Sequence, residues 1–598
     1  MINQGQPQMR ERAQINDFKG TVRRLVRYLG ANKAALVAVL ILSVVTTLLN
    51  LLIPALIGRA VDTLAIAKDM MFDMRMLTKT LMGLGAVLGV TALLSYFQGV
   101  NSAKLTQSIA LFIRKELSVK ITKLPIGYLD TRRNGDLMAR LTNDVENIAV
   151  TVSQTAGALL SAVVVIAGCV VIMLVQNWQL ALVSISPVIL SVILTRIVSG
   201  IIHKIFQKQQ AVVGKLSGHI QESVSAHKTV HAYDMIEETI EEHNKISDEL
   251  TGLALKAQVI GGLLSPLTSL LGNINFLLVV VVGGLFYMNG VPGVTIGLIQ
   301  EFTLYSRQFT KPVNELTSLF AQFQTAIASA ERVFEVLDIP DEPDEGTEVL
   351  ELESLQGNIT FEDVSFSYVP GVMVLDHFSA EIGSGKKVAI VGSTGAGKTT
   401  LVNLLLRFYE PDSGRILLDG VDIRDIPKRN LRMMITMVLQ NTSLMEDTVA
   451  ANIGYGRFGA TGDQIRDIAK VVCADSFINQ LPEGYDTMLS SDDSTLSQGQ
   501  RQLICLGRAA LKLNKILVLD EAMSSVDTAT EQTIQSTLEK ITQGQTSLII
   551  AHRLSTIRDA DNILVLENGH VAEEGDHESL IARHGTYYRL YNSYQYSE

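Results

Sequence analysis

The chain contains 598 residues, which is too long for one ordinary domain. Hydrophobic residues make up 47% of it and charged residues only 19%, a composition that predicts a membrane portion joined to a soluble one. The formal net charge of −11 argues against a nucleic-acid-binding protein, because such proteins are normally basic. The first 33 residues are polar and basic and contain no apolar core, so we expect no cleavable signal peptide.

The N-terminal segment 1–33 ends in a basic amphipathic stretch, FKGTVRRLVRYLG (18–30), just before the first apolar run. Such a stretch is typical of a helix that lies along the inner surface of a membrane. A plain helical linker fits the same residues, and the sequence leaves both interpretations open.

Four runs that contain no Asp, Glu, Lys or Arg follow: 34–58, 80–103, 147–195 and 257–300. A bilayer crossing needs roughly 20 apolar residues, so the two longer runs can each cross twice. Each of these has a polar or Gly/Pro break near its middle, QNWQ at 176–179 and YMNGVPG at 287–293. The runs therefore predict six transmembrane helices within a transmembrane domain of residues 34–325.

The sixth expected span soon meets two charged residues, Glu301 and Arg307. Charges at membrane depth are costly and usually functional, so both are candidates for a substrate pathway. Their spacing of six does not place them on one helix face as a local pair. Glu301 could meet a cationic substrate, or it could be an interior or interfacial residue of the helix bundle.

Lys and Arg residues set the expected orientation. Seven lie in the first 33 residues, eight in 104–146 and seven in 196–256, whereas loop 59–79 has four and the two short breaks have none. The positive-inside rule then places the N-terminus, both long loops and the C-terminal half in the cytoplasm. We expect a multi-pass protein of a cell inner or plasma membrane, with long loops that extend its helices into the cytoplasm.

After Leu337 the composition changes. The acidic, Pro-containing segment DIPDEPDEGTE (338–348) is typical of a linker, and we assign 326–348 to a helix extension and linker. From residue 349 to 598 short β-branched runs alternate with helical segments, which predicts a soluble α/β domain.

The segment GSTGAGKTT (392–400) has the phosphate-binding pattern G-x-x-x-x-G-K-[ST], and it lies between the strand-like KKVAIV and the helical LVNLLLRFY. Glycines let backbone N–H groups curl around phosphates, and the helix N-terminus adds a favourable partial charge. We expect Lys398 to reach the β- and γ-phosphates of ATP and the Thr399 hydroxyl to hold Mg²⁺. The candidate ATP-binding residues of this loop are Gly392, Ser393, Thr394, Gly395, Ala396, Gly397, Lys398, Thr399 and Thr400.

A second motif, KILVLDEA (515–522), reads as a buried strand that ends in two acids. We expect Asp520 to contribute to the Mg²⁺ site. Glu521, next to it, can polarise the attacking water as a general base.

With these motifs the chain resembles an ABC exporter half-transporter, in which six membrane helices of the type IV exporter fold precede one ABC nucleotide-binding domain. The resemblance covers nearly the whole chain. It implies that Tyr368 in FEDVSFSYVP stacks on adenine and that His552 in IIAHRLS contacts the γ-phosphate. It also implies that Gln440 in TMVLQNT senses Mg²⁺ and the attacking water.

The resemblance extends to LSQGQ (496–500), which matches the ABC signature, and to SSVD (524–527), which matches the D-loop with Asp527. In this family two nucleotide domains close head to tail, and each signature contacts the ATP held by the other domain. The resemblance therefore implies a dimer, with the partner's ATP contacted by Ser497, Gln498, Gly499 and Gln500. It also implies that two short coupling helices, near 125–144 and 219–238, dock on the nucleotide domains.

Three departures from the family pattern stand out: Gln498 replaces a signature glycine, SSVD replaces SALD, and TMLSSDDST (487–495) replaces the usual segment before the signature. Intact Glu521 with an altered signature resembles one half of the bacterial heterodimeric multidrug exporters. Because LSQGQ also occurs in exporters with two working sites, a homodimer stays open.

The resemblance implies ATP-driven export by alternating access, as multidrug efflux of hydrophobic or amphiphilic small molecules. A homodimeric flippase for lipid-like substrates is an alternative, as are an importer with the exporter fold and a nucleotide-gated channel or regulator. The apolar spans exclude a soluble ABC ATPase.

Overall fold

The computed structural model describes residues 18–28, 33–65, 74–132, 134–438, 443–490, 496–512, 514–520, 528–551 and 557–595. The chain divides into two compact units. The first comprises Met1–Lys123 and Arg133–Ile339, and the second comprises Leu124–Arg132 and Pro340–Glu598. A short segment from the N-terminal half of the sequence thus belongs to the same unit as the C-terminal half.

The first unit is helical. Its elements in chain order are α1 (Phe18–Tyr28), α2 (Lys33–Ala65), α3 (Met74–Ile121), α5 (Asn134–Ala139), the π-helical turn η3 (Arg140–Asp144), α6 (Val145–Val150), the π-helical turn η4 (Thr151–Thr155), α7 (Ala156–Gln176), α8 (Trp178–Ser225), α9 (His227–Ala232), α10 (Ile236–Met288) and α11 (Ile296–Asp338).

Within the described ranges, five helical stretches are long and apolar enough to cross a membrane. They are Lys33–Leu64, Met74–Ile121, Asn134–Gln176, Trp178–Ser225 and Ile236–Met288. The sixth expected span is the 43-residue helix α11, whose polar and charged side chains keep it out of this set. At 1.5 Å per residue, the 53 residues of α10 reach roughly 80 Å, more than twice the hydrocarbon thickness of a bilayer.

Both predicted breaks in the apolar runs separate two helices. At the first, the side chain of Asn177 accepts a hydrogen bond of 2.9 Å from the backbone N–H of Leu180 and caps α8. At the second, Thr295 caps α11 in the same way through the N–H of Leu298, at 3.0 Å. These side chains satisfy backbone donors that apolar surroundings would leave unpaired.

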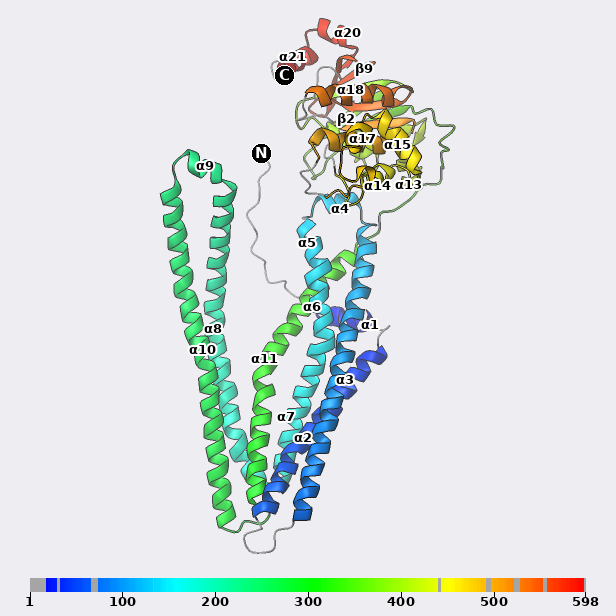
Figure 1. Ribbon diagram of the computed structural model, residues 1–598. Helices are drawn as coiled ribbons and strands as arrows, with labels where there is room; N and C mark the ends of the chain where they lie inside the picture. The colour runs from blue at the N-terminus through cyan, green and yellow to red at the C-terminus, as the bar shows by residue number, and fades with distance from the viewer. Residues whose placement is uncertain are drawn as a thin grey trace. The chain divides into compact units, whose positions relative to one another are not determined.

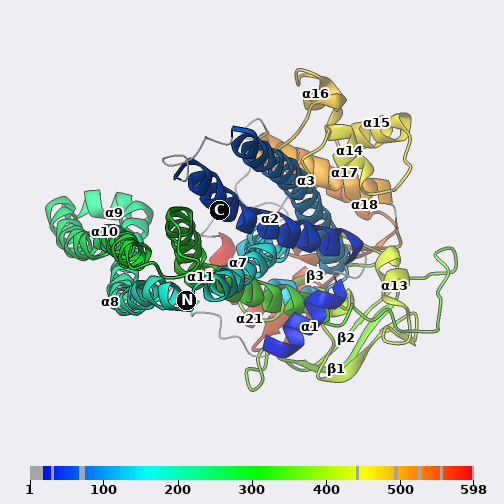
Figure 2. The same ribbon diagram turned by 90° about the horizontal axis from the view of Figure 1, so that it is seen from below.

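The helices pair along most of their length (Figures 1 and 2). α8 packs against α10, and α9 joins them at one end, while α2 packs against α3, α7 and α11. An apolar cluster that includes Leu51, Met173, Leu180 and Phe302 fills the contact between α2, α7, α8 and α11. Many other large apolar side chains of these helices are exposed, as expected for surfaces that face lipid or a second subunit.

The basic helix α1 lies against α11. The guanidinium group of Arg24 stacks 4.2 Å from the ring centroid of Phe334 and pairs with Asp338, and Phe18 meets Phe323 edge to face. The stretch 18–30, which the sequence marks as helical, contains the helix Phe18–Tyr28, and α11 covers part of it.

The second unit contains the predicted α/β domain. Its strands are β1 (Ile359–Phe366), β2 (Leu375–Ile382), β3 (Lys387–Gly392), β4 (Ser413–Leu418), β5 (Val421–Asp422), β6 (Ile435–Val438), β7 (Ile516–Asp520), β8 (Thr546–Ile550), β9 (Asn562–Glu567) and β10 (His570–Gly575). Its helices are α4 (Ile126–Asp130), α12 (Lys398–Leu405), α13 (Lys428–Met434), α14 (Val449–Gly454), α15 (Gly462–Val471), α16 (Asp475–Ile478), η5 (Gly484–Asp486), α17 (Gln498–Lys512), α18 (Thr528–Thr542), α20 (His577–Ala582) and α21 (Thr586–Gln595).

In the described residues these strands form two sheets. The four-stranded antiparallel sheet has the order β2-β1-β4-β5, and the six-stranded sheet has the order β10-β9-β3-β8-β7-β6. Strands β9, β3, β8, β7 and β6 run parallel, and their burial on both faces explains why they read as continuous apolar runs. Side chains from both sheets and from α12 share one apolar core.

Candidate functional site

The site lies where three neighbouring parallel strands end. β3 pairs with β8, and β8 pairs with β7, in a register that brings Gly392, Ile550 and Asp520 to one edge of the sheet. Ligands of open α/β sheets bind at this carboxyl edge. The fold therefore brings together two motifs that lie more than 120 residues apart in the sequence.

The loop after β3 depends on its glycines. A Cβ atom on Gly392 would lie 2.5 Å from the carbonyl oxygen of Leu566, and one on Gly397 would lie 2.8 Å from Leu375. Gly397 also has φ of +101°, which side chains disfavour, and it leads directly into α12. The backbone can curl at this point only because these side chains are absent.

Lys398, the first residue of α12, points back into the loop. Its ammonium group donates hydrogen bonds to the carbonyl oxygens of Gly392 at 2.6 Å and Ser393 at 3.2 Å. The side chain is buried, with 7% of the residue exposed. A cation held in this position, beside the N-terminus of a helix, favours phosphate.

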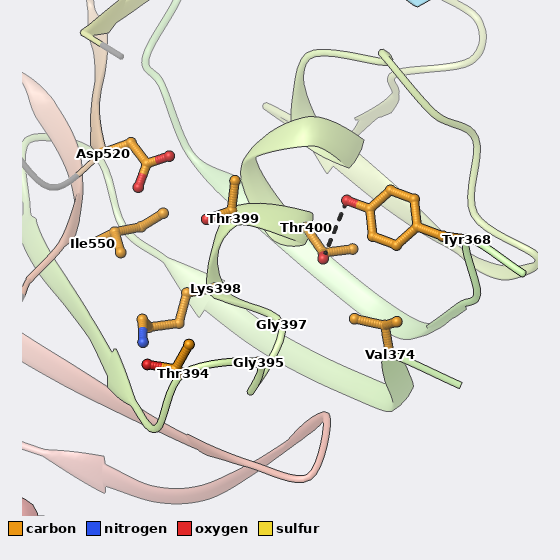
Figure 3. Close-up of a pocket in the computed structure, with 10 residues that line it drawn as sticks. All are labelled: Tyr368, Val374, Thr394, Gly395, Gly397, Lys398, Thr399, Thr400, Asp520 and Ile550. Atoms are coloured by element: carbon orange, nitrogen blue, oxygen red, sulfur yellow. Dashed lines mark hydrogen bonds between the residues drawn. The ribbon is translucent and has the colours of Figure 1, made fainter. Parts of the chain in front are cut away.

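A pocket of about 650 Å³ opens above the loop. Figure 3 shows Lys398, Thr399 and Asp520 toward one end of it and Tyr368 at the other. The lining residues are Tyr368, Val374, Thr394, Gly395, Gly397, Lys398, Thr399, Thr400, Asp520 and Ile550. All of these except Val374 and Ile550 were predicted from the sequence. The arrangement places an aromatic ring at one end of the pocket and a cation at the other, which suits a nucleoside triphosphate.

The pocket also offers oxygen donors. Thr399 is exposed and Asp520 is buried with 5% of its surface exposed, and both line the pocket. Hydroxyl and carboxylate oxygens are the ligands that Mg²⁺ prefers, together with phosphate oxygens and water. The donor set therefore fits a nucleotide-bound Mg²⁺ ion.

Tyr368 is fixed by neighbours on two elements. Its hydroxyl donates to Thr400 Oγ1 at 3.3 Å and accepts from Asn403 Nδ2 at 3.0 Å, both from α12. Its ring meets Phe366 and Tyr409 edge to face, each at a centroid distance of 4.9 Å. Tyr368 nevertheless remains 44% exposed and lines the pocket, so a bound base can reach it for stacking.

The signature segment forms the start of α17. The backbone N–H of Gln500 donates to Ser497 Oγ at 3.2 Å, and the backbone N–H of Ser497 donates to Gln500 Oε1 at 2.9 Å. This reciprocal pair is a capping box, and S-x-x-Q is its sequence pattern. Gln498 and Ser497 are exposed and Gly499 is buried, so the helix presents its capped N-terminus to the surface.

Four predicted site residues lie outside the described residues: Gln440, Glu521, Asp527 and His552. Their roles stay predictions.

In the helical unit, Glu301 is buried and Arg307 is exposed. Glu301 is buried, with 6% exposed, and accepts a hydrogen bond of 2.7 Å from Gln176 Nε2 at the end of α7. Arg307 is exposed, and its guanidinium carbon lies 5.8 Å from the ring centroid of Phe276. The structure does not bring the two charges together, in agreement with their spacing.

Sequence reasoning missed four residues of the nucleotide site: Val374 and Ile550 line the pocket, and Asn403 and Tyr409 hold Tyr368. Asn403 and Tyr409 belong to the quoted LVNLLLRFY segment, but only the tertiary fold brings them to the ring of Tyr368. Burial and a hydrogen bond to Asp130 raise the pKa of Tyr409 to about 12, so its phenol stays protonated.

Comparisons with known proteins agree with this geometry. Residues 36–313 match the ABC transporter transmembrane region, and residues 375–524 match the ABC transporter domain. The Bacillus subtilis protein named "Uncharacterized ABC transporter ATP-binding protein YfiC" is 39% identical over 584 residues, which cover 98% of this chain and 96% of that protein.

A second relative is the "Fatty acid ABC transporter ATP-binding/permease protein" of Mycobacterium tuberculosis. It is 37% identical over 621 residues, which cover 98% of this chain and 97% of the relative. Among solved structures, a bacterial Atm1-family ABC exporter with ATP bound matches with a TM-score of 0.73 and 26% identity, over 96% of this chain and 99% of that one. The chain therefore belongs to the ABC transporter family and is an exporter half-transporter, with a membrane domain followed by an ATP-hydrolysing nucleotide domain.

Proposed function

We propose that the protein exports hydrophobic or amphiphilic small molecules by ATP-driven alternating access, as one half of a dimer. The observation that carries this proposal is a phosphate-binding pocket, with Lys398 and Asp520 at one sheet edge, on the same chain as five long apolar helices. The similarity to a protein named as a fatty acid transporter supports an amphiphilic substrate. Few charges interrupt the apolar spans, which suits such molecules.

We assign separate roles in ATP binding and hydrolysis to the site residues. Tyr368 would stack on the base, the loop around Lys398 would bind the phosphates, and Thr399 and Asp520 would hold Mg²⁺. Gln440, which lies outside the described residues, would share in holding this ion. A bound Mg²⁺ ion neutralises charge that develops on the phosphate oxygens. Glu521, directly after Asp520 in the sequence, takes a proton from the attacking water, and His552 contacts the γ-phosphate.

A single chain does not complete this site in the proposed mechanism. The capped N-terminus of α17, with Ser497 and Gly499, would contact ATP on a partner's loop. Asp527 would lie at the same interface. Closure of the two nucleotide domains on ATP would turn the membrane helices from inward- to outward-facing, and hydrolysis would reset them.

We further propose a heterodimer in a cell inner or plasma membrane, with the N-terminus and nucleotide domain in the cytoplasm. The bulky Gln498, exposed in the first turn of α17, supports a heterodimer with two unequal ATP sites. A larger side chain at this point would hinder close approach to a phosphate. The chain's own Glu521 would then serve the stronger of the two sites.

Glu521→Gln tests the proposed general base. Removing a general base typically costs 10²- to 10⁴-fold, so we expect ATP turnover to fall by that order while ATP binding persists. Glu539→Gln, at an exposed position on α18, is the matched control and should retain turnover. A Glu521→Gln variant with full ATPase activity would exclude Glu521 as the base.

Inverted membrane vesicles test the direction of transport. We expect ATP-dependent uptake of a fluorescent fatty acid, or of the lipophilic cation ethidium, into these vesicles against its gradient. Movement out of the vesicles would indicate an importer, and movement only down the gradient would indicate a channel.

The purified chain, reconstituted alone in nanodiscs, tests the dimer. A heterodimer subunit should show little ATPase activity until its partner is added. Full activity of the chain alone would establish a homodimer, and Gln498→Gly should then leave that activity unchanged.

A further inference from the structure

The segment Leu124–Arg132, with helix α4 at its centre, belongs to the same compact unit as the nucleotide domain. Tyr409 holds this segment through its hydroxyl, which donates a hydrogen bond of 2.9 Å to Asp130 Oδ2. The ring of Tyr409 also packs on Gly127. A Cβ atom at that position would lie 3.1 Å from Tyr409 Cε1, so the absence of a side chain permits this close approach.

The ring of Tyr409 also contacts Tyr368, which lines the nucleotide pocket. Tyr409 and Tyr368 meet nearly perpendicularly, at 86° and 4.9 Å between ring centroids. Phe366 completes the cluster, at 4.9 Å from Tyr368 and 5.7 Å from Tyr409. Tyr409 thus contacts both Tyr368, which lines the pocket, and helix α4, which comes from the N-terminal half of the sequence.

The geometry of Tyr368 leaves it sensitive to this neighbour. Its hydroxyl bonds to Thr400 and Asn403 of α12, which fixes that end of the side chain. Figure 3 shows the bond to Thr400. Its orientation toward the pocket then depends on the rings that pack beside it. Edge-to-face aromatic pairs have preferred geometries, so a shift of Tyr409 changes the position that Tyr368 favours.

We propose that Tyr409 is a positioning residue, which couples the seating of α4 through Asp130 to the presentation of the Tyr368 ring to the base of the nucleotide. Coupling of this kind is reciprocal: if bound ATP strengthens the seating of α4, a seated α4 strengthens ATP binding by the same factor. The inference rests on the proposed role of Tyr368, and it requires no particular substrate.

The test uses the full-length protein in nanodiscs and two ligands, ATP and inorganic triphosphate. Inorganic triphosphate has no base, so it engages the loop around Lys398 without Tyr368. Asp130→Ala removes the hydrogen-bond acceptor on α4, and Tyr409→Phe removes the donor while keeping the ring. We expect each variant to weaken ATP binding about three- to tenfold, the range that one hydrogen bond supplies. Triphosphate binding should not change.

Two further variants report on the mechanism. Asp130→Asn keeps an acceptor oxygen and should bind ATP like the wild type. The double variant of Tyr409→Phe and Asp130→Ala should be no worse than either single change, because both remove the same bond. The control is Tyr485→Phe, which removes a similar bond of 2.7 Å to Asp475 elsewhere in the unit and should alter neither ligand.

Unchanged ATP binding in both single variants would overturn the inference, and so would an equal loss of ATP and triphosphate binding, which would indicate damage to the phosphate loop. Tyr368→Ala separates this result from a wrong site assignment. If that variant leaves the ratio of ATP to triphosphate affinity unchanged, Tyr368 does not bind the base, and the proposed site fails together with the inference.

Discussion

The ammonium group of Lys398 lies 2.6 Å from the carbonyl oxygen of Gly392, six residues earlier in the chain. This bond closes the loop between β3 and α12 and holds the charge at the edge of the pocket, which Lys398 lines. The position follows from the helix start at Lys398, because the preceding Gly397 adopts a left-handed conformation.

Lys398→Met should abolish most ATP binding while the domain stays folded. Hydrogen bonds to charged groups contribute more than neutral ones, so we expect the affinity to fall roughly 10- to 100-fold. A fluorescent ATP analogue titrated against the protein measures the loss. The matched control is Lys386→Met, because the Lys386 side chain is 60% exposed. A similar loss of ATP affinity in this control would contradict a specific role of Lys398 in phosphate binding.

Arg140 should contribute strongly to the stability of the helical unit. Its buried guanidinium group bonds to Asp136 at 2.9 Å and to Glu335 of α11 at 2.9 Å, so it ties η3 to the end of α11. We expect Arg140→Met to cost about 2–3 kcal/mol, because both carboxylates are partly exposed and lose less than fully buried partners would. Thermal unfolding in detergent measures the change.

Arg114→Met provides the comparison for Arg140→Met. Arg114 pairs with Glu146 at 3.2 Å, and both side chains are more than 40% exposed. An exposed pair contributes about 0–1 kcal/mol, so its loss should be small. Equal effects of the two variants would contradict the structural role of the buried Arg140 guanidinium group.

Glu342 should make the second unit sensitive to acid. Its carboxylate accepts two hydrogen bonds from Arg432, at 2.6 and 2.8 Å, and these bonds lower its pKa from the usual value near 4.5. A lowered pKa stabilises the folded state above the usual pKa, and this contribution disappears as the pH falls through the lowered value.

We therefore expect the unfolding temperature of the wild type to fall below about pH 4.5. Glu342→Gln should flatten this part of the pH profile and lower the unfolding temperature at neutral pH. The exposed Glu345, as Glu345→Gln, serves as the control. A wild-type profile in Glu342→Gln would show that other groups govern the acid response.

Glu301 should matter to the bundle as a hydrogen-bond acceptor. Glu301→Gln keeps an acceptor for Gln176 Nε2 and should leave thermal stability nearly unchanged. Glu301→Leu removes this hydrogen bond at a cost of about 0.5–1.5 kcal/mol, because Gln176 is exposed and its amide is not left buried. Thermal unfolding of both variants checks this. A stable Glu301→Gln protein that transports fluorescent fatty acid but no longer ethidium would assign the carboxylate to a cationic substrate.

Much of the architecture could be predicted from sequence because the relevant signals are local. Charge-free runs mark the long helices, and polar breaks separate them. Asn177 lies in the first break and caps the next helix, and Thr295, just after the second break, does the same. The glycine loop before Lys398 and the apolar strand before Asp520 are equally local, because each is a short pattern with its own steric reason.

Contacts between distant segments were not predictable in this way. Nothing near Arg140 in the sequence points to Glu335, and nothing near Tyr409 points to Asp130, 279 residues earlier. Each pair depends on how whole helices pack, and many side chains could fill either position. The assignment of Leu124–Arg132 to the nucleotide unit is of the same kind.

The sequence by itself determined the membrane helices, the phosphate loop and the acidic strand end, because backbone geometry and apolar periodicity restrict which residues can form them. Only the tertiary structure decided that Glu301 is buried beside Gln176, that Tyr368 is held by α12, and that Tyr409 stands between Tyr368 and α4. These relationships arise from side-chain packing across elements, which is fixed by the shape of the whole core and not by any one segment.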